Sequence, residues 1–310
     1  MAVCRGIVRS AIVLAVLVAA RAQALEMAVQ PRVTAGMQDY ELSFADVITP
    51  NGNGFRFRDG FTIRDHLPIA GAGLTVSSGR LFADLSGQWS KVGHDQGEIF
   101  QGSTFDSAGD TTGALGFEHH FDARFSRQEL NAALGWALTP NFSAYLGYKH
   151  ASLNMTQVRA PIQTVQPNFG DVLQDGSYIM DFSYHGFFLG TTYSLPVRTW
   201  GMFSAQASIA RLNASFRQHF EGSVFVVTPV GNLPLDPSFI DSRVSGDSTG
   251  LNAGLSWTGN VGAAGSALWG LTYTVGVDQS QYRFHGSATD GDFEEKSTRF
   301  RFELRYRFSL

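Results

Sequence analysis

The chain has 310 residues, of which 44% are hydrophobic and only 16% charged, and it holds 34 glycines and 25 phenylalanines. Its formal net charge of −4 argues against a nucleic-acid-binding protein, because such proteins carry a basic surface. The length allows one large all-β domain or two ordinary domains.

The first 24 residues have the pattern of a secretory signal peptide. Arg5 and Arg9 give a positive start, residues 11–20 form an apolar run, and Ala22-Gln23-Ala24 supplies small residues for cleavage. The run is too short for a membrane helix. Removal of this segment takes away Cys4, the only cysteine, so residues 25–310 are expected to form one domain with neither a disulfide nor a cysteine metal site.

Ten strand-like segments follow, and the connections between them alternate in length. Four connections are short or fairly short, at 78–80, 139–141, 196–200 and 259–267. Those at 45–68, 92–123, 157–176 and 219–247 are long, and only the last one, 287–295, is compact. An antiparallel up-and-down transmembrane β-barrel has this asymmetry, with short periplasmic turns and long extracellular loops, whereas a β-sandwich has no reason for it. The predicted strands are 32–44, 69–77, 81–91, 124–138, 142–156, 177–195, 201–218, 248–258, 268–286 and 296–308.

The side chains in these segments alternate between apolar and polar. Segment 81–91 places Leu81, Leu85 and Trp89 on one face and Asp84 and Gln88 on the other. Segments 32–44, 177–195 and 201–218 lose the alternation midway. This change predicts either β-bulges or strand ends that stand above the bilayer.

Four tryptophans lie beside the predicted periplasmic turns. In a barrel they would form an aromatic girdle at the membrane interface, whereas in a sandwich they would be core residues near strand ends. We expect the girdle, because one topology accounts for all four. Its members are Trp136, Trp200, Trp257 and Trp269.

The last segment alternates charged and apolar residues up to Phe308, and its apolar set is Phe300, Phe302, Leu304, Tyr306 and Phe308. This pattern resembles the terminal strand of Gram-negative outer-membrane β-barrel proteins, from which the chain departs by ending in Ser309-Leu310. The resemblance covers 25–310 as a pattern. It implies that the apolar set is an assembly signal for the barrel assembly machinery, and that the protein lies in the cell outer membrane, in contact with its lipids and lipopolysaccharide.

In such a barrel the polar faces line the lumen. Closing the barrel pairs segment 32–44 with the last strand, so Asp39 and Glu41 are expected beside Arg299 and Arg301, because buried charge is stable only when it is paired. The other members of the expected lumen network are Asp84, Arg127, Glu129, Lys149, Asp278, Glu303, Arg305 and Arg307.

A ten-strand lumen lined with long charged side chains should be narrow and largely plugged, which disfavours a general porin. The leading function is a structural, surface-exposed membrane protein or a narrow porin-like pore, whose arginines would give a mild anion preference. The first alternative is a barrel-rim hydrolase similar to the omptins, which also have ten strands and tall loops. The omptins use an Asp pair and an Asp-x-His pair. Here the residue two positions before His219 is Arg217 rather than an aspartate, and His94-Asp95 is not an acidic pair.

The second alternative is an adhesin or receptor that uses the long loops, for which the apolar stretch 224–230 is a candidate partner surface or mouth cap. His119 and His120, with Glu118 and Asp122, form the densest group of metal-ligand types. We expect a solvated loop there, because neighbouring strand residues point to opposite faces. The sequence predicts no metal, cofactor or nucleic-acid partner.

Overall fold

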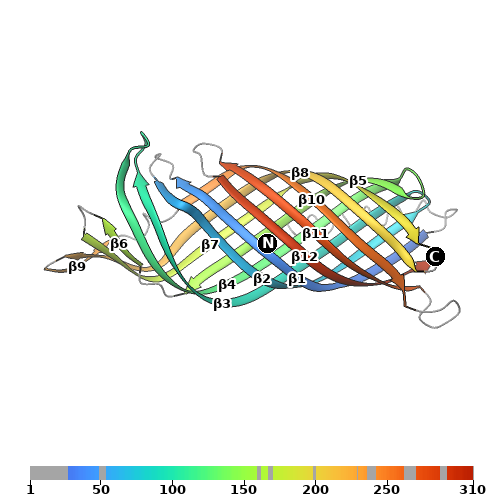
Figure 1. Cartoon of the computed structure of the whole chain (residues 1–310), viewed down its shortest axis with the longest axis horizontal. Coiled ribbons are helices and arrows are strands. Elements are labelled where there is room, and N and C mark those ends of the chain that lie inside the picture. Colours follow the sequence, from blue (N-terminus) through green and yellow to red (C-terminus); the bar gives the residue numbers. More distant parts are fainter. Residues whose placement is uncertain are drawn as a thin grey trace.

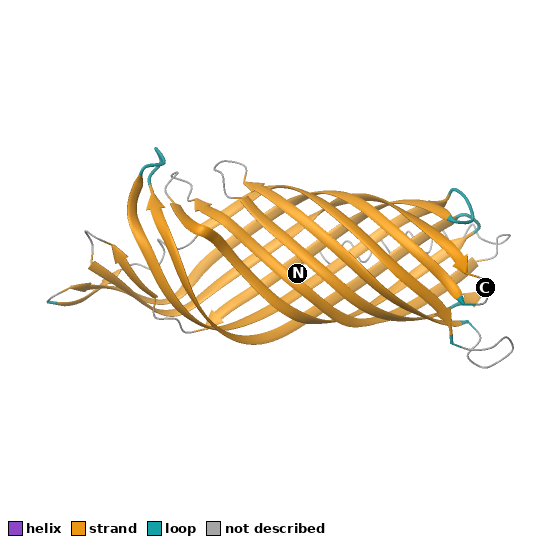
Figure 2. Ribbon diagram, viewed as in Figure 1, coloured by secondary structure: helices purple, strands orange, loops and turns teal. Residues whose placement is uncertain are grey.

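Ten long antiparallel strands wind into a closed barrel (Figure 1). The computed structural model describes residues 27–48, 54–158, 162–166, 170–197, 200–228, 230–235, 242–261, 270–286 and 292–309. Figure 2 shows the tilt of the strands around the cylinder. The expected signal peptide and Trp269 lie outside the described residues.

Each strand pairs with its neighbour along the chain, and β1 pairs with β12 to close the ring. Short strands β6 and β9 extend the sheet beside β7 and β8, and β13 continues the edge of β12 along β1. The bounds are β1 Met27–Ile48, β2 Gly54–Ser78, β3 Leu81–Phe105, β4 Thr111–Ala137, β5 Phe142–Val158, β6 Ile162–Gln166, β7 Gly170–Val197, β8 Gly201–Thr228, β9 Gly231–Leu235, β10 Ser242–Asn260, β11 Leu271–Gly286, β12 Asp292–Tyr306 and β13 Phe308–Ser309.

Most of the residues expected in long loops are in fact strand, so this part of the prediction is wrong. β3 and β4 pair continuously up to Phe105 and Thr111, and the side chain of Asp106 accepts hydrogen bonds from the N–H groups of Ala108 and Asp110 in the turn. β7 and β8 likewise remain paired as far as Asp171 and Val227. The backbone ladder therefore continues well beyond the region where the side chains alternate clearly.

The two expected short turns that are described in full, at 78–80 and 139–141, lie where they were expected. Gly79 and Arg80 connect β2 to β3, and Gly79 has a φ of 58°, a conformation that favours glycine. At the opposite end of the barrel stand the strand hairpins, such as β3–β4. These two ends are called the short-turn end and the hairpin end below.

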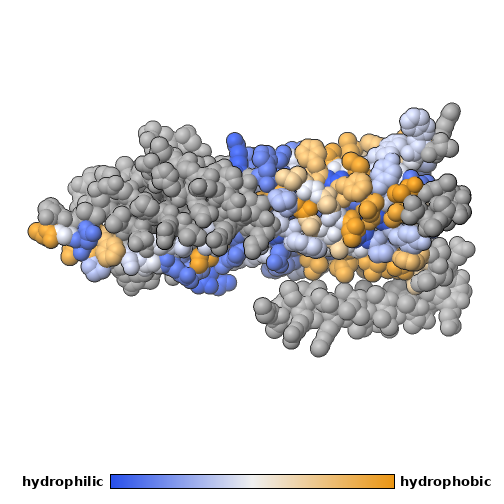
Figure 3. Space-filling model, turned by 90° about the horizontal axis from the view of Figure 1, so that it is seen from below, coloured by the Kyte–Doolittle hydropathy of each residue, from blue (hydrophilic) through white to orange (hydrophobic). Residues whose placement is uncertain are grey.

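The polarity of the wall reverses along the barrel. In the half near the short-turn end, the outer side chains of β1, β7 and β8 are apolar, as at Val33, Leu189 and Ile209, each more than 50% exposed. Further along the same strands the outward side chains become polar, while the inward side chains become apolar and buried, as at Leu42 and Phe216. Figure 3 shows hydrophobic surface toward one end of the molecule and hydrophilic surface beside it.

This reversal explains why three predicted segments lose their alternation. Among the described pairs, β7 and β8 show no register shift, and β1 shifts against β2 only between Phe44 and Asp46. A bulge is therefore not the cause. The strands keep their geometry but pass from a region with an apolar exterior into one with an apolar interior.

The strands are also long enough for this division. β8 has 28 residues, whereas a strand needs about 9–11 residues to cross a bilayer. More than half of β8 thus extends beyond any membrane that the apolar band could occupy. No helix in the described part of the chain is long and apolar enough to cross a membrane.

Candidate functional site

The lumen near the short-turn end contains a polar chamber with a volume of about 400 Å³. Its walls differ in character. β1, β3, β4 and β12 contribute charged side chains such as Arg32, Asp84 and Arg299, while β8 and β10 contribute hydroxyl and amide groups such as Gln206 and Asn252. The chamber is thus suited to water and small polar solutes.

A buried charge network closes the chamber toward the hairpin end. Glu129 lies 2.9 Å from Lys149, 3.0 Å from Arg127 and 3.2 Å from Arg299. Arg127 also lies 3.0 Å from Glu295, and all five side chains are buried. Each charge in this group therefore has a partner of opposite sign, which is the condition for keeping charge out of water.

Further ion pairs line the chamber itself. Arg301 lies 2.9 Å from Asp278 and 3.0 Å from Glu303, and Arg305 lies 2.5 Å from Glu303. Arg32 donates two hydrogen bonds to Asp84, at 2.6 and 2.8 Å. The arginines that would favour anions are therefore neutralised within the wall.

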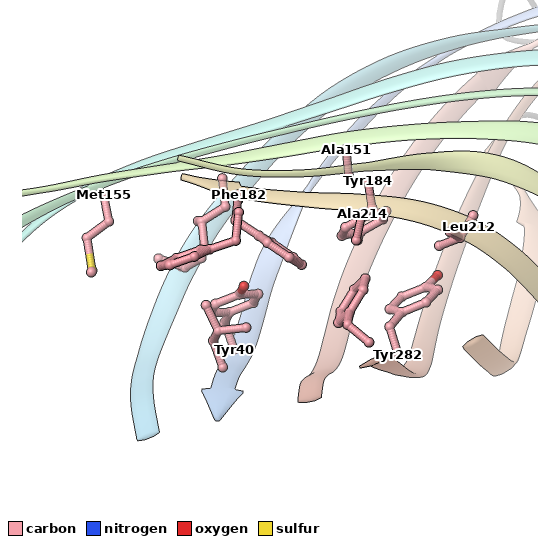
Figure 4. Close-up of a cluster of buried hydrophobic side chains, with 13 residues drawn as sticks. Tyr40, Ala151, Met155, Phe182, Tyr184, Leu212, Ala214 and Tyr282 are labelled. Carbon is pink, nitrogen blue, oxygen red and sulfur yellow. The ribbon is translucent and has the colours of Figure 1, made fainter. Parts of the chain in front are cut away.

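An aromatic cluster fills the lumen next to the charge network, on its hairpin side. The rings of Phe182 and Phe284 have centroids 4.8 Å apart, and those of Tyr184 and Tyr282 are 5.3 Å apart. Figure 4 shows Tyr184 pointing toward Tyr40 and Tyr282 from the opposite wall. The cluster consists of Tyr40, Leu42, Leu67, Ala151, Leu153, Met155, Phe182, Tyr184, Leu212, Ala214, Phe216, Tyr282 and Phe284.

The contacts in these two layers cross the lumen. Five steps from strand to strand separate opposite walls of a ten-strand ring. Arg299 on β12 reaches Glu129 on β4, four steps away, and the hydroxyl of Tyr184 on β7 donates to Glu295 on β12, also four steps away. Side chains from nearly opposite walls are thus hydrogen-bonded across the lumen at this level.

Nine predicted lumen residues lie in or beside the chamber and its network, whereas Arg307 is exposed at the short-turn end. The nine are Asp84, Arg127, Glu129, Lys149, Asp278, Arg299, Arg301, Glu303 and Arg305. Sequence reasoning missed Arg32, Glu295 and Tyr184. Arg32 shares its parity with the inward residues of β1, while Glu295 fell in a presumed connection.

The expected pairing of Asp39 and Glu41 with Arg299 and Arg301 is wrong. Gln38 lies opposite Arg299 and Gly36 opposite Arg301, so both acids point to the outer wall. There Asp39 lies 2.5 Å from His66 and Glu41 lies 2.9 Å from Arg64. The error arose because polar residues were assigned to the lumen along the whole strand, although the polarity reverses just below Asp39.

The remaining predicted surface residues lie on the outside of the apolar band. The expected assembly-signal residues Phe300, Phe302, Leu304 and Phe308 are exposed on β12 and β13, with Tyr306 partly exposed. Trp136 and Trp200 are exposed near the short-turn end, and Trp257 is partly exposed. These positions agree with the expected roles without testing them.

Comparisons with known proteins identify the fold. No protein-family model matches the chain, and no curated protein matches it. Among solved structures, the outer membrane protease OmpT from Escherichia coli superimposes with a TM-score of 0.58 at 11% identity, over 91% of this chain and 97% of that one. The chain has the fold of the outer-membrane β-barrels.

Two other solved outer-membrane proteins superimpose less well on this chain. The translocator domain of the autotransporter NalP from Neisseria meningitidis gives 0.40 at 8% identity, covering 90% of this chain and 88% of that one. The attachment invasion locus protein Ail of Yersinia pestis gives 0.29 at 7% identity, covering 90% and 99%.

Of the residues considered for hydrolase chemistry, His219 and Arg217 have described side chains, and these two do not form the omptin Asp-x-His pair. His219 Nε2 lies 3.4 Å from Glu221, and Arg217 is exposed. The side chains of His94, Asp95, Glu118, His119, His120 and Asp122 lie outside the described set, although their backbones belong to β3 and β4. Among described side chains, no group of three or more His, Cys, Asp or Glu could hold a metal ion.

The apolar stretch 224–230 belongs mostly to β8 rather than to a loop. Val226 is buried, whereas Val230 is 93% exposed in the turn before β9. The stretch therefore extends the sheet at the hairpin end, and among its described side chains the exposed one is Val230 at the tip.

Proposed function

We propose that the protein is an outer-membrane barrel, closed to solute flow, that holds a rigid strand cylinder at the cell surface. The apolar band would sit in the membrane with the short turns in the periplasm. The hairpin end would then extend outward. The observation that carries this proposal is the filled lumen, in which ion pairs and aromatic contacts join nearly opposite walls.

The reversal of wall polarity supports the same arrangement. A strand segment with an apolar exterior and a polar interior suits a bilayer. The hairpin-side half has charged side chains outside and an aromatic core inside, which is the arrangement of a water-soluble β-protein. Such a projecting half would stay ordered in water because it buries its own apolar core.

A pore is less well supported than a closed barrel. The predicted anion preference depended on uncompensated arginines, whereas Arg299, Arg301 and Arg305 each lie close to a carboxylate. The chamber would fill with water from the short-turn end but would lead nowhere. Outer-membrane lipids, lipopolysaccharide and the barrel assembly machinery remain the proposed partners.

Labelling of single cysteines on intact cells tests location and orientation together. Residues 25–310 contain no cysteine, so each introduced thiol reports one site. We expect Ser107→Cys, in the turn between β3 and β4, to react with a membrane-impermeant maleimide on intact cells. Arg80→Cys, in the turn between β2 and β3, should react only after the outer membrane is permeabilised; equal labelling of both without permeabilisation would contradict the proposal.

A further inference from the structure

The outer wall carries a groove across β7, β8, β10 and β11. Its volume is about 640 Å³, and its lining is mostly apolar. It lies at the level where the wall polarity reverses, since the outward side chains below it are apolar and Asp247 above it is charged. In a membrane this level corresponds to the boundary between acyl chains and headgroups.

Two arginines and a threonine form a single row across this groove. Arg211 lies directly opposite Thr249, which in turn lies directly opposite Arg283. Adjacent strands are about 4.8 Å apart, so the two arginine backbones are separated by roughly 10 Å, with the small Thr249 between them. Both guanidinium groups can therefore reach an anion that rests over Thr249.

Both charged side chains that line the groove are cationic. Its only charged lining residues among those described are Arg211 and Arg283. Each has a carboxylate neighbour outside the groove, with Arg211 Nη2 3.5 Å from Asp247 and Arg283 Nε 3.0 Å from Glu294. A guanidinium has five N–H donors, so each arginine retains donors for a ligand.

The apolar part of the groove lies directly below this row. Leu251 and Ile209 face each other across β10 and β8, Leu189 is next to Ile209, and all three are about half exposed on the outer wall. Phe187 adds an aromatic ring beside Arg211. This order of groups, cationic above and apolar below, complements a lipid with a phosphate headgroup and an acyl chain.

We propose that this groove binds a phosphate-bearing membrane lipid. The phosphate rests over Thr249 between Arg211 and Arg283, and one acyl chain lies along Ile209 and Leu251. The inference rests on the proposed membrane location. It adds a defined lipid site to an otherwise nonspecific lipid-facing wall.

Native mass spectrometry of the full barrel in a non-ionic detergent tests this site. Dioleoyl phosphatidic acid is the probe, and dioleoylglycerol, which has the same acyl chains and no phosphate, is its control. We expect saturable binding of the phosphatidic acid, weakened about two- to fivefold by Arg211→Gln or by Arg283→Gln and about tenfold or more by both. Arg64→Gln is the matched control, because Arg64 is equally exposed on the outer wall and also pairs with a glutamate, Glu41; its binding should stay unchanged.

Several results would overturn the proposal. Equal binding of dioleoylglycerol would mean that only acyl chains occupy the groove, and full competition by millimolar inorganic phosphate would mean a simple anion site. Dimers that exclude lipid would assign the groove to a second copy of the chain, and equal effects of Arg64→Gln would mean nonspecific charge. Insertion of each variant into phosphatidylcholine vesicles is measured separately, so failure of the proposed location is distinguishable from failure of the lipid site.

Discussion

Glu129 lies among three cationic side chains, Arg127, Lys149 and Arg299, in the most buried part of the lumen. Without the charge of Glu129, these two arginines and one lysine would have a single buried acid, Glu295, as their partner. Since water cannot easily replace this carboxylate, its charge decides whether the network is stable.

We expect Glu129→Gln to lower the free energy of unfolding by about 3–5 kcal/mol, because it leaves buried cations without a partner. Glu41→Gln is the control. Glu41 also contacts two cations, Arg64 and Lys296, but it does so on the outer wall, where such pairs contribute about 0–1 kcal/mol. Urea unfolding of the barrel in phospholipid vesicles measures both values, and a similar small effect for the two variants would show that the network is not sealed from water.

Glu294 shows how charges behave in the projecting half, six residues beyond Phe300, the last exposed apolar residue among the described side chains of β12. The hydrogen bond from Lys296, at 2.7 Å, together with those from Gln281 and Arg283, lowers the pKa of Glu294 from 4.5 to about 2. Because the folded-state pKa is depressed, these contacts stabilise the fold at neutral pH. Their contribution is lost as the pH falls from about 4.5 through about 2.

We therefore expect Glu294 to titrate near pH 2, and Lys296→Gln to move its pKa back toward 4.5, because the largest stabilising contact is removed. Carboxyl-carbon NMR of glutamate-labelled protein measures the midpoint, and Glu294→Gln assigns the signal. A midpoint that does not change in Lys296→Gln would contradict the account.

At the scale of a strand, the reversal of wall polarity sets the limit of the membrane-facing band. On β1 the boundary lies between Met37, which is exposed and apolar, and Asp39, which pairs with His66 on the outer wall. The inward residues change in the opposite sense, from Gln38 to Tyr40 and Leu42. The outer face of β1 thus changes from apolar to polar while the strand remains continuously paired with β12.

Arginine substitutions on one face of β1 test this boundary. Val33→Arg places a charge within the apolar band and should destabilise the barrel in vesicles by about 2–4 kcal/mol. Asp39→Arg, on the same face and six residues further, should change the stability by less than about 1 kcal/mol, because that position is exposed to water. The free energy of unfolding of each variant is compared with that of the wild type in vesicles and in detergent micelles. An equal loss of stability for the two variants in vesicles would contradict a boundary between Met37 and Asp39.

Much of this architecture was predictable from alternation and connection length. The ten strands, the short turns and the inward direction of residues such as Glu129 and Asp278 follow from a period of two combined with an apolar exterior. The length of the hairpins was not predictable in this way. Beyond the apolar band the apolar side chains move from the outer to the inner face of each strand, so the alternation changes phase and the strand pattern is interrupted. The predicted partners of Asp39 and Glu41 were wrong for the same reason. Both acids do pair with cationic side chains, but on the outer face of β1 instead of the inner face.

The cross-lumen contacts were even less accessible to sequence reasoning. The pairing of Arg127 with Glu295 joins residues 168 positions apart, and it depends on the barrel diameter and on the stagger of its strands. Neither quantity is encoded in a local pattern. The apolar inward residues of β5, β7 and β11 indicate a core only after the ring is closed.

At the scale of the whole molecule, two layers of side chains cross the lumen, and we propose that together they close it. The charge network around Glu129 lies on the chamber side, and the aromatic contacts of Phe182 and Tyr184 lie on the hairpin side. The layers differ in chemistry, so removal of a charge would weaken the first, and loss of side-chain volume would weaken the second. Both must open before a solute could cross.

Single-channel recording in planar lipid bilayers tests this closure most directly. We expect the wild-type barrel, at a density confirmed by vesicle insertion, to produce no reproducible conductance steps. A variant that combines Phe182→Ala, Tyr184→Ala and Glu129→Gln, which opens both layers, should produce steps if it inserts, and so serves as the positive control. Reproducible ohmic steps from the wild-type protein at neutral pH would contradict the account.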